Sequence, residues 1–176
     1  ALAPRLTSRA VPESDRVVIR TGGTSGEPVP FVQDRAAVAW KDATALVLRE
    51  RLGWPAGTRA AYLWGAAQDL PPGARGWWRR AKDHVRQQWL ERTLYLPAGD
   101  LSDAALDRHL DRLEAFRPQA LQGYPTATDL LARRAAAQGR RIAIPLALLT
   151  AEPVLSAQRE RVASAFGARV LAFYGA

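Results

Sequence analysis

The residues best suited to chemistry lie in one short polar segment with the sequence TGGTSGEP, residues 21–28. Its glycines let the backbone approach a ligand closely, and the hydroxyls of Thr21, Thr24 and Ser25 can donate hydrogen bonds beside exposed backbone N–H groups. Such a loop can wrap an anion. It is not a Walker loop, because no Gly-Lys-Ser/Thr follows, and it is not the dinucleotide fingerprint, because a strand is predicted after it. The alternative is a solvated turn of a long hairpin.

Short apolar runs on either side of this loop, and beyond it, predict the framework that positions it. β-Branched residues predict strands at 17–20 and 30–33, so the loop joins two strands. Further along the chain, apolar runs alternate with helical patterns, as in βαβ units whose parallel strands need crossover helices. The expected strands are 60–63, 93–96, 120–122, 146–149 and 170–173.

Helix signals separate these strands. A first helix is expected over 35–52, ending at Gly53, and others over 102–116, 126–138 and 156–166. Leu106, Leu110 and Leu113 form one stripe that should cover a sheet. Thr126 and Asp129 have capping-box-like spacing. The predicted fold class is α/β: a mainly parallel sheet with helices on both faces, preceded by a strand-loop-strand phosphate-binding element.

Composition restricts the class of protein. The chain has 176 residues, 48% of them hydrophobic and 24% charged, as in a soluble globular protein, and it has no cysteine, which removes disulfides and thiolate chemistry. The longest apolar stretch, 142–149, is far shorter than the roughly 20 residues of a membrane span. The first nine residues do not form a signal peptide, so we expect a cytoplasmic protein. Because methionine is absent, even at position 1, we expect a segment of a longer chain.

A formal charge of +8 raises the question of a polyanion partner. The arginines are dispersed along the chain, which favours solvated charge over a nucleic-acid surface. Between residues 77 and 89, four residues recur at helical spacing and are interpreted as a buried face, with the arginines solvated on the other face: Trp78, Ala81, Val85 and Trp89. The alternative is a partner or substrate-access surface. His84 and His109 have no partners at ligand spacing, so no metal site is expected. A row of aspartates is interpreted as a solvent-exposed helix face, with Asp100 or Ser102 as cap: Asp100, Asp103, Asp107 and Asp111.

Three ordered segments resemble the adenylate-forming superfamily of acyl-CoA synthetases and luciferases. The loop 21–28 resembles its phosphate-binding loop. The segments LQGYPT at 121–126 and LTAEPV at 149–154, the latter running on to VLAFYGA at 170–176, are similar to the phenylacetate-CoA ligase-like branch. The resemblance covers roughly residues 16–176. It implies that the chain, 1–176, is one partial domain within the large N-terminal domain of such an enzyme, with the C-terminal domain absent.

The resemblance implies an acid-thiol ligase that uses ATP, Mg²⁺ and CoA. Such an enzyme forms an acyl-adenylate from a small carboxylic acid, releases pyrophosphate and then makes a thioester. Adenylation joins two anions, so alignment and charge stabilisation matter more than a nucleophilic side chain. The implied phosphate-binding residues are Thr21, Gly22, Gly23, Thr24, Ser25 and Gly26. The implied adenine- and acyl-binding residues are Tyr124, Pro125, Ala151, Glu152, Pro153, Tyr174, Gly175 and Ala176.

Two departures from the family pattern limit what this chain alone should do. Many relatives carry a lysine where this chain has Glu27 or Val29. The glutamate that helps to bind Mg²⁺ in the family would lie two positions beyond Ala176, and the ribose-binding aspartate and catalytic lysine lie further downstream. No metal ligand or certain catalytic residue is therefore assigned here, and the segment alone is expected to be inactive. The alternative is a non-catalytic nucleotide- or polyanion-binding module. The sequence indicates neither the acid nor the oligomeric state.

Overall fold

The computed structural model describes residues 10–20, 30–65 and 92–173. The chain divides into two compact units, Ala1–Pro55 and Ala56–Ala176, and each is described by itself. The phosphate-loop residues 21–26, the tryptophan-rich segment 77–89 and residues 174–176 lie outside the described residues. The division into units leaves the predicted single partial domain as an expectation.

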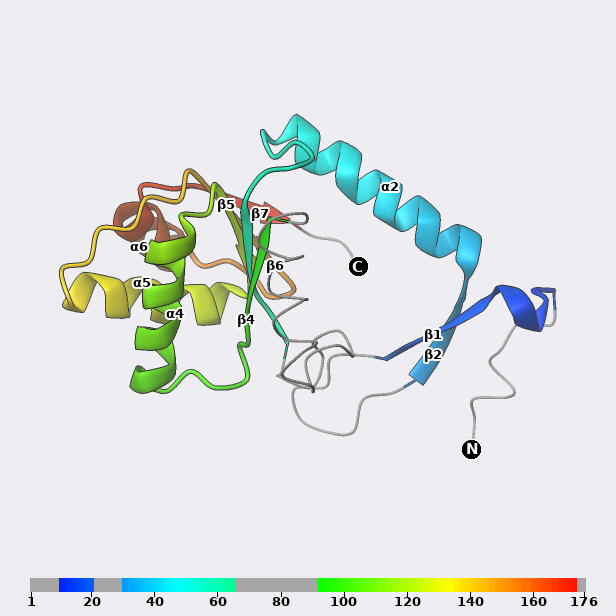
Figure 1. Cartoon of the computed structure of the whole chain (residues 1–176), viewed down its shortest axis with the longest axis horizontal. Helices are drawn as coiled ribbons and strands as arrows, with labels where there is room; N and C mark the ends of the chain where they lie inside the picture. Colours follow the sequence, from blue (N-terminus) through cyan, green and yellow to red (C-terminus); the bar gives the residue numbers. More distant parts are fainter. Residues whose placement is uncertain (1–9, 21–29, 66–91, 174–176) are drawn as a thin grey trace. The chain divides into compact units, whose positions relative to one another are not determined.

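The first unit contains a hairpin and a long helix (Figure 1). A 3₁₀ turn, η1 (Glu13–Asp15), precedes β1 (Arg16–Arg20) and β2 (Pro30–Asp34), which pair antiparallel with Val18 opposite Val32. Helix α2 (Arg35–Arg51) begins where the Asp34 side chain accepts a hydrogen bond of 2.6 Å from the Ala37 amide. The helix stops before Gly53, whose φ of 87° suits glycine. The two predicted strands and the helix that follows them are confirmed, whereas the loop between the strands lies outside the described residues.

The second unit contains a five-stranded parallel sheet in the order β4-β3-β5-β6-β7 (Figure 1). Its strands are β3 (Ala60–Leu63), β4 (Thr93–Leu96), β5 (Ala120–Gly123), β6 (Leu146–Thr150) and β7 (Arg169–Phe173). Each coincides with a predicted strand to within one residue. The chain begins at β3, places β4 on one side of it and then continues with β5 on the other. The order therefore changes direction between β3 and β5, and open α/β sheets bind ligands at the carboxyl ends of strands flanking such a point.

Three helices cover one face of this sheet (Figure 1): α4 (Asp103–Phe116), α5 (Pro125–Ala137) and α6 (Ser156–Phe166). The predicted leucine stripe of α4 is buried, with Leu110 and Leu113 fully inaccessible, and joins one core with residues of β5, β6 and α6. Right-handed crossovers that advance in one direction place their helices on the same face. The connection from β3 to β4, residues 66–91, lies outside the described residues. The α/β class and the parallel sheet are confirmed.

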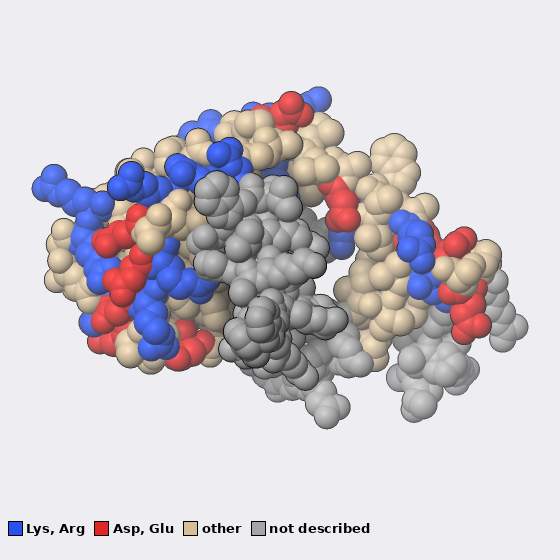
Figure 2. All heavy atoms as spheres, in the orientation of Figure 1, with Lys and Arg blue, Asp and Glu red and all other residues tan. Residues whose placement is uncertain are grey.

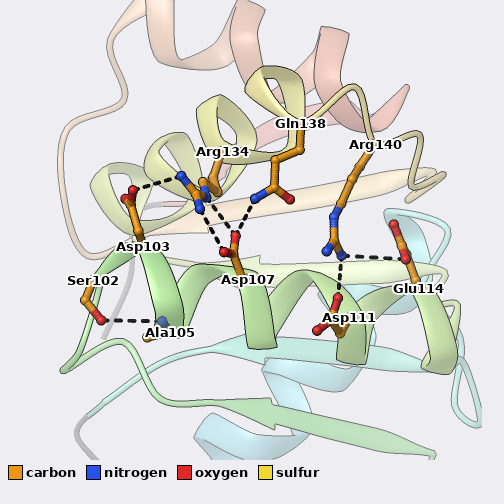
Figure 3. A network of polar contacts seen from close by, with 9 residues as sticks. All are labelled: Ser102, Asp103, Ala105, Asp107, Asp111, Glu114, Arg134, Gln138 and Arg140. Carbon is orange, nitrogen blue, oxygen red and sulfur yellow. Dashed lines mark hydrogen bonds and ion pairs between the residues drawn. The ribbon is translucent and has the colours of Figure 1, made fainter.

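The acidic side chains of α4 are largely exposed, as the sequence indicated for Asp103 and Asp111, but they also pair with arginines, which the sequence did not indicate. Asp107 receives two hydrogen bonds of 2.7 Å from Arg134 of α5, and Arg134 also reaches Asp103 at 2.8 Å (Figure 3). Asp111 pairs with Arg140 beyond α5 at 2.7 Å. The Arg134 hydrogen bonds lower the pKa of Asp107 to about 2. Of the two predicted caps, Ser102 accepts a hydrogen bond from the Ala105 amide, while Asp100 accepts one from the Ser102 amide.

Candidate functional site at the carboxyl edge of the parallel sheet

Two aromatic rings meet where strands β3 and β5 end, at the point where the strand order changes direction. Trp64 follows β3 and Tyr124 follows β5, and the last residues of these strands, Leu63 and Gly123, lie opposite one another in the parallel register. The rings stack with centroids 4.4 Å apart and an interplanar angle of 18°. Trp64 remains 37% exposed. The edge therefore offers a preformed apolar wall beside a ligand-binding position of the fold.

Gly123 allows α5 and the end of β3 to pack closely together at this edge. A Cβ added there would lie 2.8 Å from Thr128 Oγ1 and 3.1 Å from Leu63 Cβ. Real Cβ atoms do not approach neighbours so closely, so only glycine allows the first turn of α5 to pack against the end of β3. The glycine in the predicted segment LQGYPT thus has a packing reason within the sheet.

A carboxylate from another loop satisfies the amino end of α5. The helix begins after Tyr124 with Pro125 in its first turn, and the Tyr124 side chain offers no cap. Instead, Oε2 of Glu152, which follows β6, accepts hydrogen bonds from the Thr126 backbone amide at 3.0 Å and from Thr126 Oγ1 at 2.7 Å. Free amides and the helix dipole make this end favourable for an anion. Glu152 thereby joins the loop after β6 to the turn after β5.

The predicted capping box of α5 is wrong. Thr126 donates to Glu152 instead of capping its own helix. Asp129, only 5% exposed, receives hydrogen bonds from Arg133 of the same helix and from Arg161 of α6 at 2.9 Å and 2.5 Å. Burial raises the pKa of Asp129, but the Arg161 and Arg133 hydrogen bonds outweigh this effect and lower it. Asp129 therefore joins two helices.

The turn after β6 has an unusual backbone. Ala151 has φ of 71°, a left-handed conformation that is unfavourable for a residue with a Cβ. Pro153 restricts the preceding Glu152 to extended conformations. Ala151, Glu152 and Pro153 are all exposed. Such strain persists where surrounding contacts impose it, and the hydrogen bonds between Glu152 and Thr126 are such contacts.

Five of the predicted adenine- and acyl-binding residues are described, and they lie in two neighbouring turns: Tyr124, Pro125, Ala151, Glu152 and Pro153. Tyr124 is half-buried and Pro125 buried, and both lie beside the turn of Ala151–Pro153 through the hydrogen bonds of Thr126. The remaining predicted members lie outside the described residues, so their placement stays a prediction: Thr21, Gly22, Gly23, Thr24, Ser25, Gly26, Tyr174, Gly175 and Ala176.

Neither the position of Trp64 at this edge nor the contact of Thr126 with Glu152 is predicted from the sequence. Trp64 lies just past a short apolar run, and its position at the strand's carboxyl end was the available signal. Thr126 was interpreted as a local cap because its partner, Glu152, lies on a different loop. The hydroxyl of Thr128, fully buried, has no hydrogen-bond partner within the described residues.

Within the described ranges, no group of three His, Asp or Glu side chains could hold a metal ion. His109 is buried, and its Nε2 lies 3.0 Å from the Pro97 carbonyl oxygen. Burial lowers the pKa of His109 despite that hydrogen bond. We therefore assign Mg²⁺ to none of the described residues. No helix in the described part of the chain is both long and apolar enough to cross a bilayer.

Among the described residues, basic side chains do not gather into one patch on the face shown in Figure 2, where acidic side chains lie among them over the helices of the second unit. Within the described ranges, five arginines are engaged in ion pairs: Arg108, Arg133, Arg134, Arg140 and Arg161. These contacts support the interpretation of dispersed charge.

No protein-family model and no curated protein matches the sequence. Solved structures do match the fold. A 2-hydroxyisobutyryl-CoA ligase in its postadenylation state, in complex with R3-HIB-AMP, has a TM-score of 0.63 and 20% identity over 92% of this chain and 33% of its own. VinN in complex with L-aspartate has a TM-score of 0.61 and 15% identity over 97% of this chain and 40% of its own.

A long-chain-fatty-acid-CoA ligase, FadD1 from Archaeoglobus fulgidus, has a TM-score of 0.56 and 15% identity over 90% of this chain and 31% of its own. The chain thus spans between 31% and 40% of the length of these three structures. At this level of identity the likeness concerns the fold. The chain has the fold of the corresponding part of these structures.

Proposed function

We propose that this chain belongs to an ATP-dependent carboxylate ligase of the phenylacetate-CoA ligase type. The ligase joins a small carboxylic acid to AMP, releases pyrophosphate and then transfers the acyl group to CoA. The observation that carries the proposal is the meeting of two predicted segments at one sheet edge: the turn at Tyr124 and Pro125, and the turn at Ala151–Pro153, joined by Thr126 and Glu152. They meet beside the point where the strand order changes direction.

The chemistry of adenylation suits such an edge. A carboxylate oxygen attacks the α-phosphorus of ATP, the bond to the bridging oxygen breaks, and pyrophosphate leaves with the electron pair. Both reactants are anions, so the protein's main tasks are to align them and to stabilise the charge on the leaving group. In this proposal the aromatic wall of Trp64 and Tyr124 borders the acid, and the turn at Ala151–Pro153 borders the adenine. The loop 21–26 would hold the departing pyrophosphate.

Proteins of similar fold support the proposed chemistry. The 2-hydroxyisobutyryl-CoA ligase was crystallised in a postadenylation state with R3-HIB-AMP, and in a thioesterification state with both 2-HIB-AMP and CoA. ATP and CoA as substrates of the present protein are carried over from that likeness and from the sequence motifs. The phenylacetate-CoA type rests on the segments at 121–126 and 149–154.

The direct test is isotope exchange between pyrophosphate and ATP, measured on the full-length protein with a panel of aryl and alkyl carboxylic acids. We expect exchange only in the presence of an acid. Thr24→Ala and Ser25→Ala should abolish it, whereas Ser14→Ala, at an exposed serine outside the loop, should leave it unchanged. A folded protein that shows no exchange with any acid contradicts the proposal.

Two further measurements are needed. The first separates adenylation from thioester formation, and the second distinguishes the ligase from a polyanion-binding module. Thioester formation after addition of CoA, detected by mass spectrometry, tests the second half-reaction independently of the first. A non-catalytic polyanion-binding module would instead bind nucleic acid with strong salt dependence and show no exchange.

A further inference from the structure

We propose that Thr126 is a positioning residue for the nucleotide: by holding the Glu152 carboxylate, it fixes the turn at Ala151–Pro153 in the shape that receives ATP. This inference rests on the proposed function. It assigns to Thr126 a role that the sequence pattern did not suggest, because Thr126 follows the predicted acyl-side turn rather than the adenine-side segment.

The geometry joins the two loops at a single atom. Both the amide and the hydroxyl of Thr126 donate to Oε2 of Glu152, at 3.0 Å and 2.7 Å. Hydrogen bonds to a charged acceptor are roughly twice as strong as neutral ones. Because the Thr126 amide belongs to the first turn of α5, the carboxylate also interacts favourably with the positive end of the helix dipole.

The turn that this contact holds would not keep its shape unaided. Ala151 adopts a left-handed conformation that non-glycine residues avoid, and Ala151, Glu152 and Pro153 are exposed and so gain little from burial. The hydrogen bonds from Thr126 are therefore the contacts best placed to keep the turn in this conformation. A rigid turn holds its backbone groups where a ligand needs them and avoids the entropic cost of ordering them on binding.

The register of the sheet indicates which substrate the turn serves. Thr150, the last residue of β6, lies opposite Phe173, the last described residue of β7. Phe173 directly precedes Tyr174, which the resemblance assigns to the adenine. The turn that begins at Ala151 therefore follows the strand that pairs with β7, whereas Tyr124 follows β5, which does not pair with β7. We accordingly expect Thr126 to affect ATP more than the acid.

The test compares Thr126→Val, which keeps the shape but removes the hydroxyl, with Thr126→Ser, which keeps the donor. In full-length protein we expect Thr126→Val to raise KM for ATP about fivefold, the size of effect that loss of one modest hydrogen bond gives. kcat and KM for the acid should change less than about twofold, because no reacting group is touched. Thr126→Ser should restore the wild-type KM. Thr44→Val, which removes a hydroxyl that bonds within α2, is the matched control and should change nothing.

A double variant tests whether the two residues act together. Glu152→Ala should raise KM for ATP at least as much as Thr126→Val, because it removes both hydrogen bonds from Thr126. Adding Thr126→Val to Glu152→Ala should have no further effect, because the bond of the hydroxyl is already lost. Additive effects overturn the inference. So does a Thr126→Val variant whose KM for ATP equals that of the wild type, or one whose KM values for ATP and acid rise equally.

Hydrogen exchange without substrate gives a readout besides activity. The backbone amides of Ala151, Glu152, Val154 and Leu155 should exchange faster in Thr126→Val than in Thr126→Ser or Thr44→Val, while those of β5 and β6 stay protected. Unchanged exchange at 151–155 overturns the positioning role even if the enzyme is active. A wild-type protein without acid-dependent pyrophosphate exchange overturns the proposed function instead, and the nucleotide role with it.

Discussion

The indole ring of Trp64 lies nearly parallel to the phenol ring of Tyr124, with ring centroids 4.4 Å apart, although the two residues follow different strands. The contact depends on the parallel register that aligns Leu63 with Gly123. Beyond the strands, the Trp64 amide still donates to the Leu96 carbonyl at 3.0 Å, so the backbone of Trp64 is fixed as well. The aromatic wall of the candidate site is therefore built on rigid elements rather than on a free loop.

This stack should appear as an energetic coupling. In urea unfolding, the double-mutant cycle of Trp64→Leu and Tyr124→Leu should give an interaction free energy of about 0.5–1.5 kcal/mol, the range for stacked aromatic pairs. Tyr124→Phe keeps the ring and should retain most of the coupling in the same cycle. Strict additivity of the two leucine substitutions would show that the rings do not stack in solution.

The left-handed turn gives a second prediction. Ala151 has φ of 71°, so Ala151→Val should destabilise the fold by about 1–2 kcal/mol, because a branched Cβ clashes further in that conformation. Ala151→Gly should be neutral or slightly stabilising, since the relief of strain and the greater entropy of the unfolded chain nearly cancel. Chemical denaturation of the two variants beside the wild type measures both. Equal stability of the valine and glycine variants would contradict the turn geometry.

The tight packing around Gly123, at the end of β5, gives a third prediction. Gly123→Ala would place a Cβ 2.8 Å from Thr128 Oγ1 and should lower the free energy of unfolding by about 1–3 kcal/mol, as overpacking does. Thr128→Ala should partly rescue it, because it removes the nearest atom but leaves the Leu63 contact at 3.1 Å. The midpoint of urea unfolding for the single and double variants checks this. A Gly123→Ala variant as stable as the wild type would show that the first turn of α5 shifts freely.

Local signals were sufficient for most of the fold. The strands at 60–63 and 93–96 were predicted with their observed bounds, because each is a short apolar run whose ends are marked by polar or turn residues. Helix α6 begins and ends at the predicted residues 156 and 166, since Pro153 lies before it and Gly167 after it. The turn η1 carries no periodic pattern, and it was not predicted.

Contacts between distant segments were beyond sequence reasoning. The partners of Asp107 and Asp129 lie on other helices, and nothing in the local pattern specifies which arginine crosses to which carboxylate. The predicted cap at Thr126 failed for the same reason, because its acceptor is supplied by the loop after β6. Short motifs were sufficient to select the turns that carry Tyr124 and Glu152, whereas the contact between Trp64 and Tyr124 arises from tertiary packing that no local pattern specifies.

The pairing of Asp107 with Arg134 predicts a loss of stability in acid. The hydrogen bonds lower the pKa of Asp107 from 3.8 to about 2, so the folded chain binds its proton later than the unfolded chain does as the pH falls. The stabilisation is therefore complete above about pH 4 and is lost between about pH 4 and pH 2. Asp107→Asn should reduce this loss in thermal unfolding between about pH 5 and pH 2, whereas Asp42→Asn, at an exposed residue of α2, should not. If the thermal stabilities of the two variants depend identically on pH, Arg134 does not pair with Asp107 in solution.

His109 predicts a separate change nearer to neutral pH. Burial lowers its pKa below 6.5, and the positive charges of Arg112 and Arg108 lower it further, while the Pro97 carbonyl and Asp100 act in the opposite direction. The unfolded chain therefore takes up a proton before the folded chain does. The free energy of unfolding should fall as the pH drops below about 6.5, with a slope of at most about 1.4 kcal/mol per pH unit.

The two histidines of the chain allow a matched comparison for this prediction. His109→Gln should abolish the part of the slope between about pH 6.5 and pH 5, and His84→Gln should preserve it, measured by urea unfolding at fixed ionic strength. Because Nδ1 of His109 is buried and has no hydrogen-bond partner within the described residues, its protonation would bury an uncompensated charge. Stability that rises as the pH falls through this range would mean that His109 gains an acidic partner, the opposite of the arrangement found here.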